Sequence, residues 1–197
     1  MTPSARRIVA VDGLDGSGKS RLANALATAC AADGVAVTQL HVDDFRRDVD
    51  FAGLDAGEEA ARYYADYFDL AALDRALASF QAGSAGDAEL AIVEGVFTLR
   101  VPAVAASAGL IVLTVSADEA RRRILARDRH KGRTDEEIER RIARRYFPGQ
   151  ERYRADHDPA ARADAIVDNE DWRRPRVVRF VPGRLPAPVE RWLAQLG

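Results

Sequence analysis

The chain has 197 residues, of which 47% are hydrophobic and 30% are charged, and its formal net charge is −2. This length predicts a single domain over residues 1–197, and the composition is typical of a folded soluble protein. One cysteine, Cys30, and three histidines exclude a disulfide scaffold and the common structural zinc sites. No apolar run approaches the roughly 20 residues of a membrane helix. Residues 1–7 show no signal-peptide pattern, so a cytoplasmic location without a membrane partner is expected.

Predicted strands and helices alternate along the chain. Short apolar, β-branched runs predict strands at residues 7–12, 35–42, 90–93, 110–115, 165–167 and 177–181. Helices are predicted at residues 20–32, 59–81 (one helix or two), 116–127 and 134–146, with a last one in the proline-bounded tail. The helices beginning at Ser116 and Thr134 each open on a capping-box pattern, S/T-x-x-E. This alternation predicts an α/β fold, in which a parallel sheet is covered by helices on both faces.

A phosphate-binding loop follows the first predicted strand. Residues 13–20, GLDGSGKS, match G-x-x-x-x-G-K-[ST] without a mismatch, and a predicted helix follows them. Glycines let the backbone curl so that its N–H groups point at phosphate oxygens, and the start of the helix adds positive potential. Lys19 is expected at the β- and γ-phosphates, and Ser20 at Mg²⁺. The predicted nucleotide-binding residues here are Gly13, Asp15, Gly16, Ser17, Gly18, Lys19 and Ser20.

Acidic residues follow two further predicted strands. Asp43 and Asp44 come after the second strand, and Glu94 ends the third. Ligands of open α/β sheets bind at the carboxyl ends of the strands, where the P-loop also lies. Phosphoryl transfer to a hydroxyl needs a carboxylate that orients the alcohol and accepts its proton, and acidic groups that hold Mg²⁺. Asp43 and Glu94 are therefore candidate catalytic and metal-binding residues. The alternative for Asp43 and Asp44 is that they belong to a solvated loop without a catalytic role.

A basic segment lies late in the chain. Residues 121–154 hold 13 basic and 6 acidic residues, and the densest stretch is residues 127–133, RDRHKGR, between two predicted helices. Cations placed over transferring phosphates accelerate the reaction, and a closing lid excludes water. We therefore predict an arginine-rich lid around residues 127–134. A solvated helix face is the alternative, whereas the overall charge and the absence of aromatic residues between 121 and 145 argue against a nucleic-acid site.

Together these segments resemble the uridine kinase branch of the P-loop kinases, near phosphoribulokinase and bacterial pantothenate kinase. The resemblance rests on the P-loop and on residues 42–46 (VDDFR), 93–97 (VEGVF), 127–133 and 162–169 (RADAIVDN). It implies a three-layer P-loop NTPase sandwich whose five-stranded, mainly parallel sheet has the P-loop strand in its centre. It also implies ATP and Mg²⁺ as cofactors.

The resemblance implies roles for single residues. Asp43 would be the base and a metal-linked carboxylate, and Glu94 the second acidic group. Arg127, Lys131 and Arg133 would be lid residues near the phosphates, with Arg127 catalytic, Arg133 on the nucleotide and Lys131 on the substrate. The candidate substrate-binding residues are Asp43, Phe45, Arg46, Tyr64, Phe97 and Lys131. The aromatic residues among them could stack a ring or belong to the core.

The sequence leaves the acceptor open. Arg46 stands where many members of the family have tyrosine, and residues 46–93 contain no histidine that could read a base. The predicted function is transfer of the γ-phosphate of ATP to a hydroxyl of a small metabolite, a nucleoside such as uridine or cytidine. One alternative is a nucleoside monophosphate kinase, in which Arg46, Arg47 and Arg100 could clamp the acceptor phosphate. Another is a non-enzymatic ATP-binding module. A homo-oligomer is compatible with the sequence, and residues 173–197 have no assigned role.

Overall fold

The computed structural model describes residues 6–84 and 86–196. Residues 1–5, on which most of the expectation about a signal peptide rests, lie outside the described residues. The strands of the described part are β1 (Arg7–Gly13), β2 (Val37–His41), β3 (Leu90–Glu94), β4 (Gly109–Thr114), β5 (Ala165–Asp168) and β6 (Arg176–Phe180). They form one sheet in the order β2-β3-β1-β4-β5-β6.

The helices of the described part occupy the connections between the strands and the end of the chain. The α-helices are α1 (Lys19–Ala32), α2 (Ala56–Asp66), α3 (Leu70–Gln81), α4 (Pro102–Ser107), α5 (Ala117–Arg129), α6 (Asp135–Arg141), α7 (Phe147–His157), α8 (Pro159–Arg162) and α9 (Ala187–Leu193). The 3₁₀ helices are η1 (Val42–Phe45) and η2 (Thr98–Arg100), and η3 (Ile142–Tyr146) is a π-helix that joins α6 to α7.

The sheet topology confirms the predicted fold class and corrects the strand count. The five strands β1 to β5 run parallel, and β1, which leads into the P-loop, is the middle one. The sixth strand, β6, pairs antiparallel with β5 at the edge. It is antiparallel because only the short loop 169–175 separates it from β5, and a parallel neighbour would need a longer crossover.

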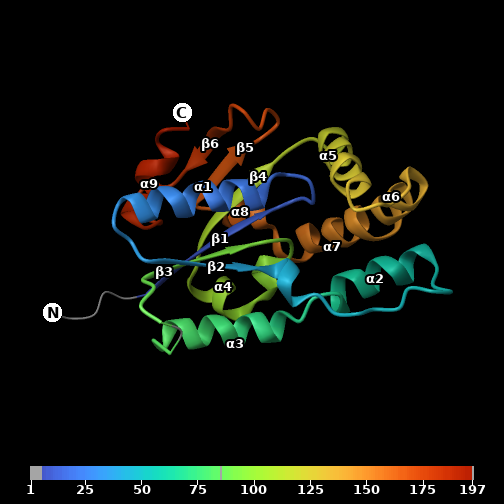
Figure 1. The fold of residues 1–197 in the computed structure, drawn as a ribbon, viewed down its shortest axis with the longest axis horizontal. Coiled ribbons are helices and arrows are strands. Elements are labelled where there is room, and N and C mark those ends of the chain that lie inside the picture. The colour runs from blue at the N-terminus through green and yellow to red at the C-terminus, as the bar shows by residue number, and fades with distance from the viewer. Residues whose placement is uncertain (1–5, 85, 197) are drawn as a thin grey trace.

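Helices cover both faces of the sheet, as predicted. Figure 1 shows α1 and α9 on one side of the strands and α3 and α4 on the other. Alternate residues of β1 serve the two layers, since Val9 and Val11 face α1 while Ile8 and Ala10 join the larger core with α3 and α4. In the described part of the chain, no helix has both the length and the apolar character needed to cross a bilayer.

The helical segments differ in detail from the prediction. Residues 59–81 belong to two helices, because Asp69 interrupts the run and caps α3 by accepting a hydrogen bond from the Ala72 N–H at 2.9 Å. A complete capping box, which the prediction lacks, opens α2 at Asp55 and Glu58. The predicted boxes at Ser116 and Thr134 are only half formed. Each hydroxyl accepts the expected backbone N–H, but the glutamates pair with arginines instead.

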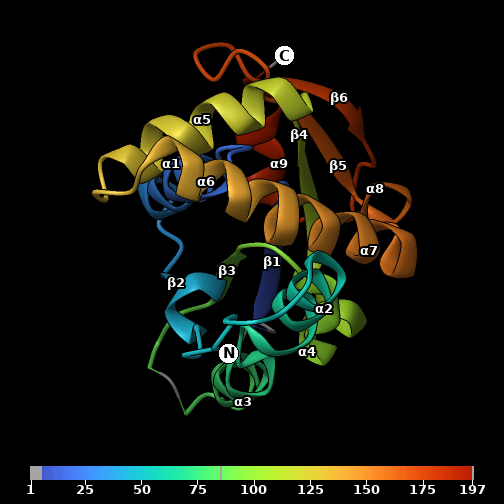
Figure 2. The same cartoon turned by 90° about the vertical axis from the view of Figure 1, so that its right-hand side faces the viewer.

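The predicted lid is a helical hairpin. Helix α5 ends at Arg129, a turn over residues 130–134 follows, and α6 returns alongside α5 (Figure 2). The chain then stays helical through η3 and α7, so α7 reaches back across the carboxyl ends of β1 and β4. This arrangement places the basic residues of the turn above the P-loop end of the sheet.

Candidate active site

The P-loop has the backbone that its sequence predicts. Gly16 and Gly18 have positive φ angles of 77° and 94°, in the left-handed region that favours glycine. A Cβ atom at Gly16 would also lie 2.5 Å from the Ala120 carbonyl oxygen of α5. The first hydrogen bond of α1 runs from the Leu22 N–H to Gly18 O. The N–H groups of Lys19, Ser20 and Arg21 in the first turn of α1 therefore stay available for an anion at the start of the helix.

Neighbouring elements hold the P-loop in place. Asn169, after β5, is buried and donates from Nδ2 to Ser17 O at 2.6 Å. Gln150 of α7 accepts from the Asp15 N–H at 2.8 Å and donates from Nε2 to the Asp15 carboxylate at 3.0 Å. Asp15 therefore anchors the loop through its N–H instead of offering that group to a phosphate. Sequence reasoning missed Gln150, whose only signal would have been its place on a helix crossing the P-loop.

A cavity of about 250 Å³ lies over the loop, and we call it the phosphate cavity. It is lined by Asp15, Gly16, Gly18, Lys19, Ser20, Arg21, Asp43, Glu94, Gly95, Val96, Arg123 and Arg127. The structure thus brings together the predicted catalytic residues Lys19, Asp43, Glu94 and Arg127. Lys19 folds back onto the loop, with Nζ 2.7 Å from Leu14 O.

Two predicted P-loop residues lie beneath this surface. Gly13 ends β1 and packs against Leu113, so close that a Cβ atom would lie 2.6 Å from the Leu113 carbonyl oxygen. Ser17 is fully buried. Both residues therefore support the loop from beneath. Among the described residues that line the phosphate cavity, neither of the two is present.

Glu94, Ser20 and His41 form a hydrogen-bonded group at one wall of the phosphate cavity. Glu94 Oε1 accepts from Ser20 Oγ at 2.9 Å and lies 2.8 Å from His41 Nδ1. The Glu94 side chain is buried, and His41 stands opposite it in the β2–β3 register. Sequence reasoning missed His41, although it lies near the end of the strand predicted at residues 35–42, two residues before Asp43.

The oxygen atoms of this group suit Mg²⁺. A hydroxyl and a carboxylate are hard donors, and Mg²⁺ is usually held by one or two protein carboxylates together with substrate phosphates. No group of three or more His, Cys, Asp or Glu side chains within residues 6–84 and 86–196 forms a ready-made metal site. The residues present therefore fit a cation that arrives with a nucleotide, held by Ser20 and Glu94.

Asp43 stands apart from that group on η1. Its side chain is 61% exposed, and the nearest cation is Arg46, with Nη2 3.7 Å from Asp43 Oδ2. Desolvation raises the pKa of Asp43, and the carboxylates of Asp15 and Glu94 raise it further, while Arg46 and Lys19 lower it. A carboxylate with a raised pKa and a free approach suits a general base.

A second, much smaller cavity of about 30 Å³ adjoins the phosphate cavity, with Asp15, Asp43 and Arg127 lining both. The second cavity is lined by Asp15, Asp43, Arg46, Tyr63, Tyr67, Phe68, Arg127, Asp128, Lys131, Arg133 and Tyr146. Tyr146 reaches it from the π-helix η3, and Tyr63 reaches it from α2. The Tyr63 hydroxyl donates to the Asp15 carboxylate at 3.2 Å.

Asp128 gathers the cations of the segment predicted as a lid. Its carboxylate is 1% exposed and lies 2.7 Å from Arg127 Nε, 3.8 Å from Lys131 Nζ and 3.3 Å from Arg133 Nη1. Burial opposes its ionisation, but the hydrogen bond from Arg127 and the three positive charges outweigh this, so the pKa of Asp128 is lowered. The basic pattern of residues 127–133 predicts a role for its cations only, whereas the structure shows that Asp128 gathers them.

A third cavity extends from the other side of the P-loop and shares Gly18 and Arg21 with the phosphate cavity. Trp172 and Trp192 line it, and the Arg21 guanidinium lies 3.8 Å from the centre of the Trp172 ring. This cavity lies where the chain after β5 meets α1. Residues 173–197, which had no predicted role, thus contribute to a hollow beside the P-loop.

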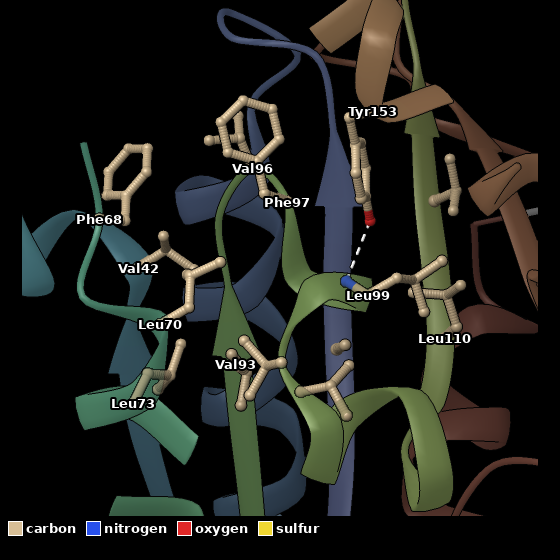
Figure 3. Packing of buried hydrophobic residues seen from close by; sticks show 14 of the residues in the cluster. Val42, Phe68, Leu70, Leu73, Val93, Val96, Phe97, Leu99, Leu110 and Tyr153 are labelled. Atoms are coloured by element: carbon tan, nitrogen blue, oxygen red, sulfur yellow. Dashed lines mark hydrogen bonds between the residues drawn. The ribbon is translucent and has the colours of Figure 1, made fainter. Parts of the chain in front are cut away.

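The structure places several predicted substrate residues elsewhere. Phe97 is fully buried among Tyr63, Phe68 and Tyr153, as Figure 3 shows for Phe68 and Tyr153. Tyr64 is also buried, and its hydroxyl donates to Asp156 of α7 at 3.0 Å. Both rings are core because their helix and loop face the sheet.

Phe45, Arg47 and Arg100 also lie away from the two cavities. Phe45 packs against the core. Arg47 pairs with Asp69 at 3.0 Å, and the Arg100 guanidinium lies over the Tyr64 ring. The predicted clamp of three arginines is therefore wrong for the arrangement seen here, since only Arg46 reaches a cavity. Likewise Arg133, predicted on the nucleotide, lines the second cavity and not the phosphate cavity among the described residues.

Comparison with known proteins agrees with this geometry. A family model described as an AAA domain matches residues 9–144, from β1 to η3. The chain belongs to this AAA domain family. The matched segment includes the P-loop, both acidic strand ends and the predicted lid, so the AAA domain carries all four predicted catalytic residues. The predicted P-loop kinase fold is confirmed.

Solved structures share the fold of this AAA domain. A possible uridine kinase from Bacillus stearothermophilus aligns with a TM-score of 0.62 and 20% identity, covering 84% of this chain and 90% of that one. A candidate fructose transport system kinase from Silicibacter sp. TM1040 aligns with a TM-score of 0.59 and 22% identity, covering 78% of this chain and 87% of that one. No curated protein matches the chain significantly.

Proposed function

We propose that this protein is an ATP-dependent kinase that transfers the γ-phosphate to a hydroxyl of a small, nucleoside-type alcohol. One observation carries the proposal: Asp43 lines the phosphate cavity together with Lys19, and its side chain is 61% exposed, so an acceptor hydroxyl can reach it from solvent. The possible uridine kinase among the structural neighbours supports the nucleoside class, and the candidate fructose transport system kinase supports a small hydroxylated acceptor.

The arrangement accounts for each part of the transfer. The acceptor hydroxyl lies at Asp43, which accepts its proton as the oxygen attacks the γ-phosphorus. A new oxygen–phosphorus bond forms, the bond from the γ-phosphorus to the bridging oxygen breaks, and ADP leaves. Lys19, the N–H groups of the P-loop and Arg127 neutralise the charge that spreads over the transferring group. Mg²⁺, held by Ser20 and Glu94 when bound with ATP, would supply further positive charge at the β- and γ-phosphates.

The acidic residues argue against a protein that only binds ATP. A carboxylate near a triphosphate repels it, and no binding function requires one at Asp43. In a kinase that same carboxylate receives the proton of the acceptor. The nucleotide base would lie in the third cavity, since that cavity continues from the phosphate cavity past Gly18 and Arg21.

The test measures the release of ADP from ATP in the presence of Mg²⁺ and one acceptor at a time. The acceptors are nucleosides, nucleoside monophosphates, simple sugars, sugar phosphates and pantothenate. Asp43→Asn should lower kcat by about 10²- to 10³-fold while leaving the Kd for ATP within about twofold. Asp44→Asn is the matched control, because Asp44 is the exposed neighbour that lines neither cavity in the described residues. Full turnover by Asp43→Asn would disprove the assignment of the base. ATP binding without acceptor-stimulated ADP release would favour the non-enzymatic alternative.

A further inference from the structure

A fourth cavity, of about 230 Å³, lies between the P-loop, the end of β4 and the helices α7 and α8. It is nearly as large as the phosphate cavity, and Val96 is the one residue that lines both. The proposed transfer uses none of its side chains. Most of its walls are apolar, and they include Leu14, Val96, Phe97, Val112, Leu113 and Pro159.

A buried carboxylate, that of Asp12, lies in the wall of the fourth cavity. Asp12 stands on β1 directly before the P-loop and is 2% exposed. Its Oδ2 atom accepts three hydrogen bonds: from the Thr98 N–H at 3.1 Å, from the Thr98 hydroxyl and from the Tyr153 hydroxyl at 2.7 Å. Its Oδ1 atom accepts none from the described residues, and it is not one of their fully enclosed polar atoms. Oδ1 is therefore the oxygen that a molecule in the cavity can reach.

The network around Asp12 fixes this orientation. The Tyr153 hydroxyl accepts from the Leu99 N–H at 3.0 Å, so its own proton is directed at Asp12 (Figure 3). Burial raises the pKa of Asp12, while its hydrogen bonds and the charge of Lys19 favour the ionised form. The Lys19 ammonium itself binds Leu14 O at 2.7 Å and lines the phosphate cavity. Asp12 thus lacks the direct cationic partner that a buried aspartate ordinarily has.

The other charged groups around the fourth cavity leave its sign to Asp12. Arg154 and Asp158 line it as well, and both are exposed residues of opposite charge. His157 packs against the Tyr153 ring, and burial lowers the pKa of His157, so the imidazole is uncharged at neutral pH. A molecule that enters therefore meets apolar walls and one negative oxygen without a hydrogen-bond donor.

We propose that the fourth cavity binds a small apolar amine, whose ammonium group donates to Asp12 Oδ1 while its hydrocarbon part packs against Leu14 and Val96. An ammonium supplies both the missing donor and the missing cation. A hydrocarbon without a polar group would leave Oδ1 unpaired, and a carboxylate or phosphate would be repelled by it. The amine is a ligand and not a reactant, since no residue of the proposed transfer except the P-loop backbone borders this cavity.

The bound amine would act on the P-loop as a positive effector. The Asp12 carboxylate attracts Lys19 and repels a triphosphate on the loop above it. An ammonium at Oδ1 neutralises this charge, which leaves more of the field of Lys19 for the nucleotide. The amine should therefore strengthen ATP binding, and ATP should strengthen amine binding by the same factor. This effect rests on the nucleotide site of the proposed function, whereas the amine site does not.

A titration with three compounds of similar shape tests the site. Benzylamine, benzyl alcohol and phenylacetate are added in turn to the full-length protein at neutral pH, and binding is followed by NMR. We expect the Kd for benzylamine to be at least tenfold lower than that for benzyl alcohol, with phenylacetate weaker still. Asp12→Asn keeps the shape of the side chain and should remove the preference for the amine. Equal binding of amine and alcohol by the wild-type protein, or an unchanged preference in Asp12→Asn, would overturn the proposal.

A second pair of variants leaves Asp12 intact, so its result does not depend on the stability of Asp12→Asn. Ala160 is exposed on α8 and lines the cavity, whereas its exposed neighbour Ala161 does not. Ala160→Phe should fill the cavity from its rim and weaken benzylamine binding at least tenfold. Ala161→Phe is the matched control and should bind benzylamine as the wild-type protein does. Equal affinities of the two variants for benzylamine would refute the placement of the amine in this cavity.

The effect on the nucleotide is measured by binding and not by turnover. The Kd of a non-hydrolysable ATP analogue with Mg²⁺ should fall about threefold or more when benzylamine is saturating, and Ala160→Phe should abolish this change. Benzylamine binding that leaves the nucleotide Kd unchanged, or raises it, would refute the role as a positive effector. Amine binding by a protein that binds nucleotide but releases no ADP with any acceptor would refute the proposed kinase while the amine site stands.

Discussion

His41 and Glu94 face each other at the ends of adjacent strands, with His41 Nδ1 2.8 Å from Glu94 Oε1. The same oxygen accepts the Ser20 hydroxyl of the P-loop at 2.9 Å. The imidazole therefore limits the orientations of a carboxylate that we assign to the cation site. Residues that orient metal-binding carboxylates contribute substantially to metal affinity.

Replacement of His41 by alanine should raise the Mg²⁺ concentration needed for half-maximal activity by about tenfold. The carboxylate of Glu94 loses its fixed position but keeps its charge, so turnover at saturating Mg²⁺ should change less. A titration of the rate against Mg²⁺ measures both quantities. His130→Ala, an exposed histidine on the lid turn, is the control. An unchanged Mg²⁺ requirement in His41→Ala would show that Glu94 is not the residue that holds the ion.

The pH dependence of turnover should report Asp43. Its pKa is raised by desolvation and by the neighbouring carboxylates, so activity should fall, as the pH drops, at a higher pH than an ordinary aspartate with a pKa of about 3.9 would give. Arg46 favours the ionised form, so Arg46→Gln should move this acid limb of kcat to still higher pH. Arg47→Gln, which removes a pair with Asp69, should leave it in place. If Arg46→Gln left the acid limb of kcat in place, the group that titrates would not be Asp43.

Asp128→Asn should destabilise the fold by about 2 kcal/mol at neutral pH, since it removes the buried partner of three cations that are themselves partly solvated. The folded state lowers the pKa of Asp128, so its contribution is present above the pKa of the unfolded chain and is lost as the pH falls through the lowered value. Urea unfolding of the wild-type protein and of Asp128→Asn should therefore show a smaller difference in the free energy of unfolding at acidic pH than at neutral pH. Asp135→Asn, in an exposed pair with Arg129, should have no measurable effect. If the difference in the free energy of unfolding did not change with pH, the variant would have lost packing and not ion pairs.

Trp172→Ala should weaken ATP binding by about tenfold if the base lies in the third cavity, because an aromatic contact contributes on the order of 1 kcal/mol. Inorganic triphosphate supplies the matched ligand, since it occupies the P-loop without a base. Calorimetry should therefore show an unchanged affinity for triphosphate. Equal weakening of both ligands would mean that Trp172 supports the P-loop and does not contact the base.

The sequence by itself determined the P-loop, the acidic strand ends and the order of the elements. These features are local: a contiguous motif sets its own backbone through Gly16 and Gly18, and alternating apolar runs set the strands. Because the carboxyl ends of parallel strands share one edge, the meeting of Lys19, Asp43 and Glu94 also followed from the order of the elements. Arg127 joined them because its segment follows the fourth strand.

Only the tertiary structure decided which side chains meet across the sheet and the lid. Helical spacing alone does not tell a ring in the core from a ring at a ligand, so Tyr64 and Phe97 were assigned to the substrate and lie in the core. The contacts of Gln150 with Asp15 and of His41 with Glu94 join residues 135 and 53 positions apart. Such pairs depend on the packing of whole elements, and no local pattern in the sequence records them.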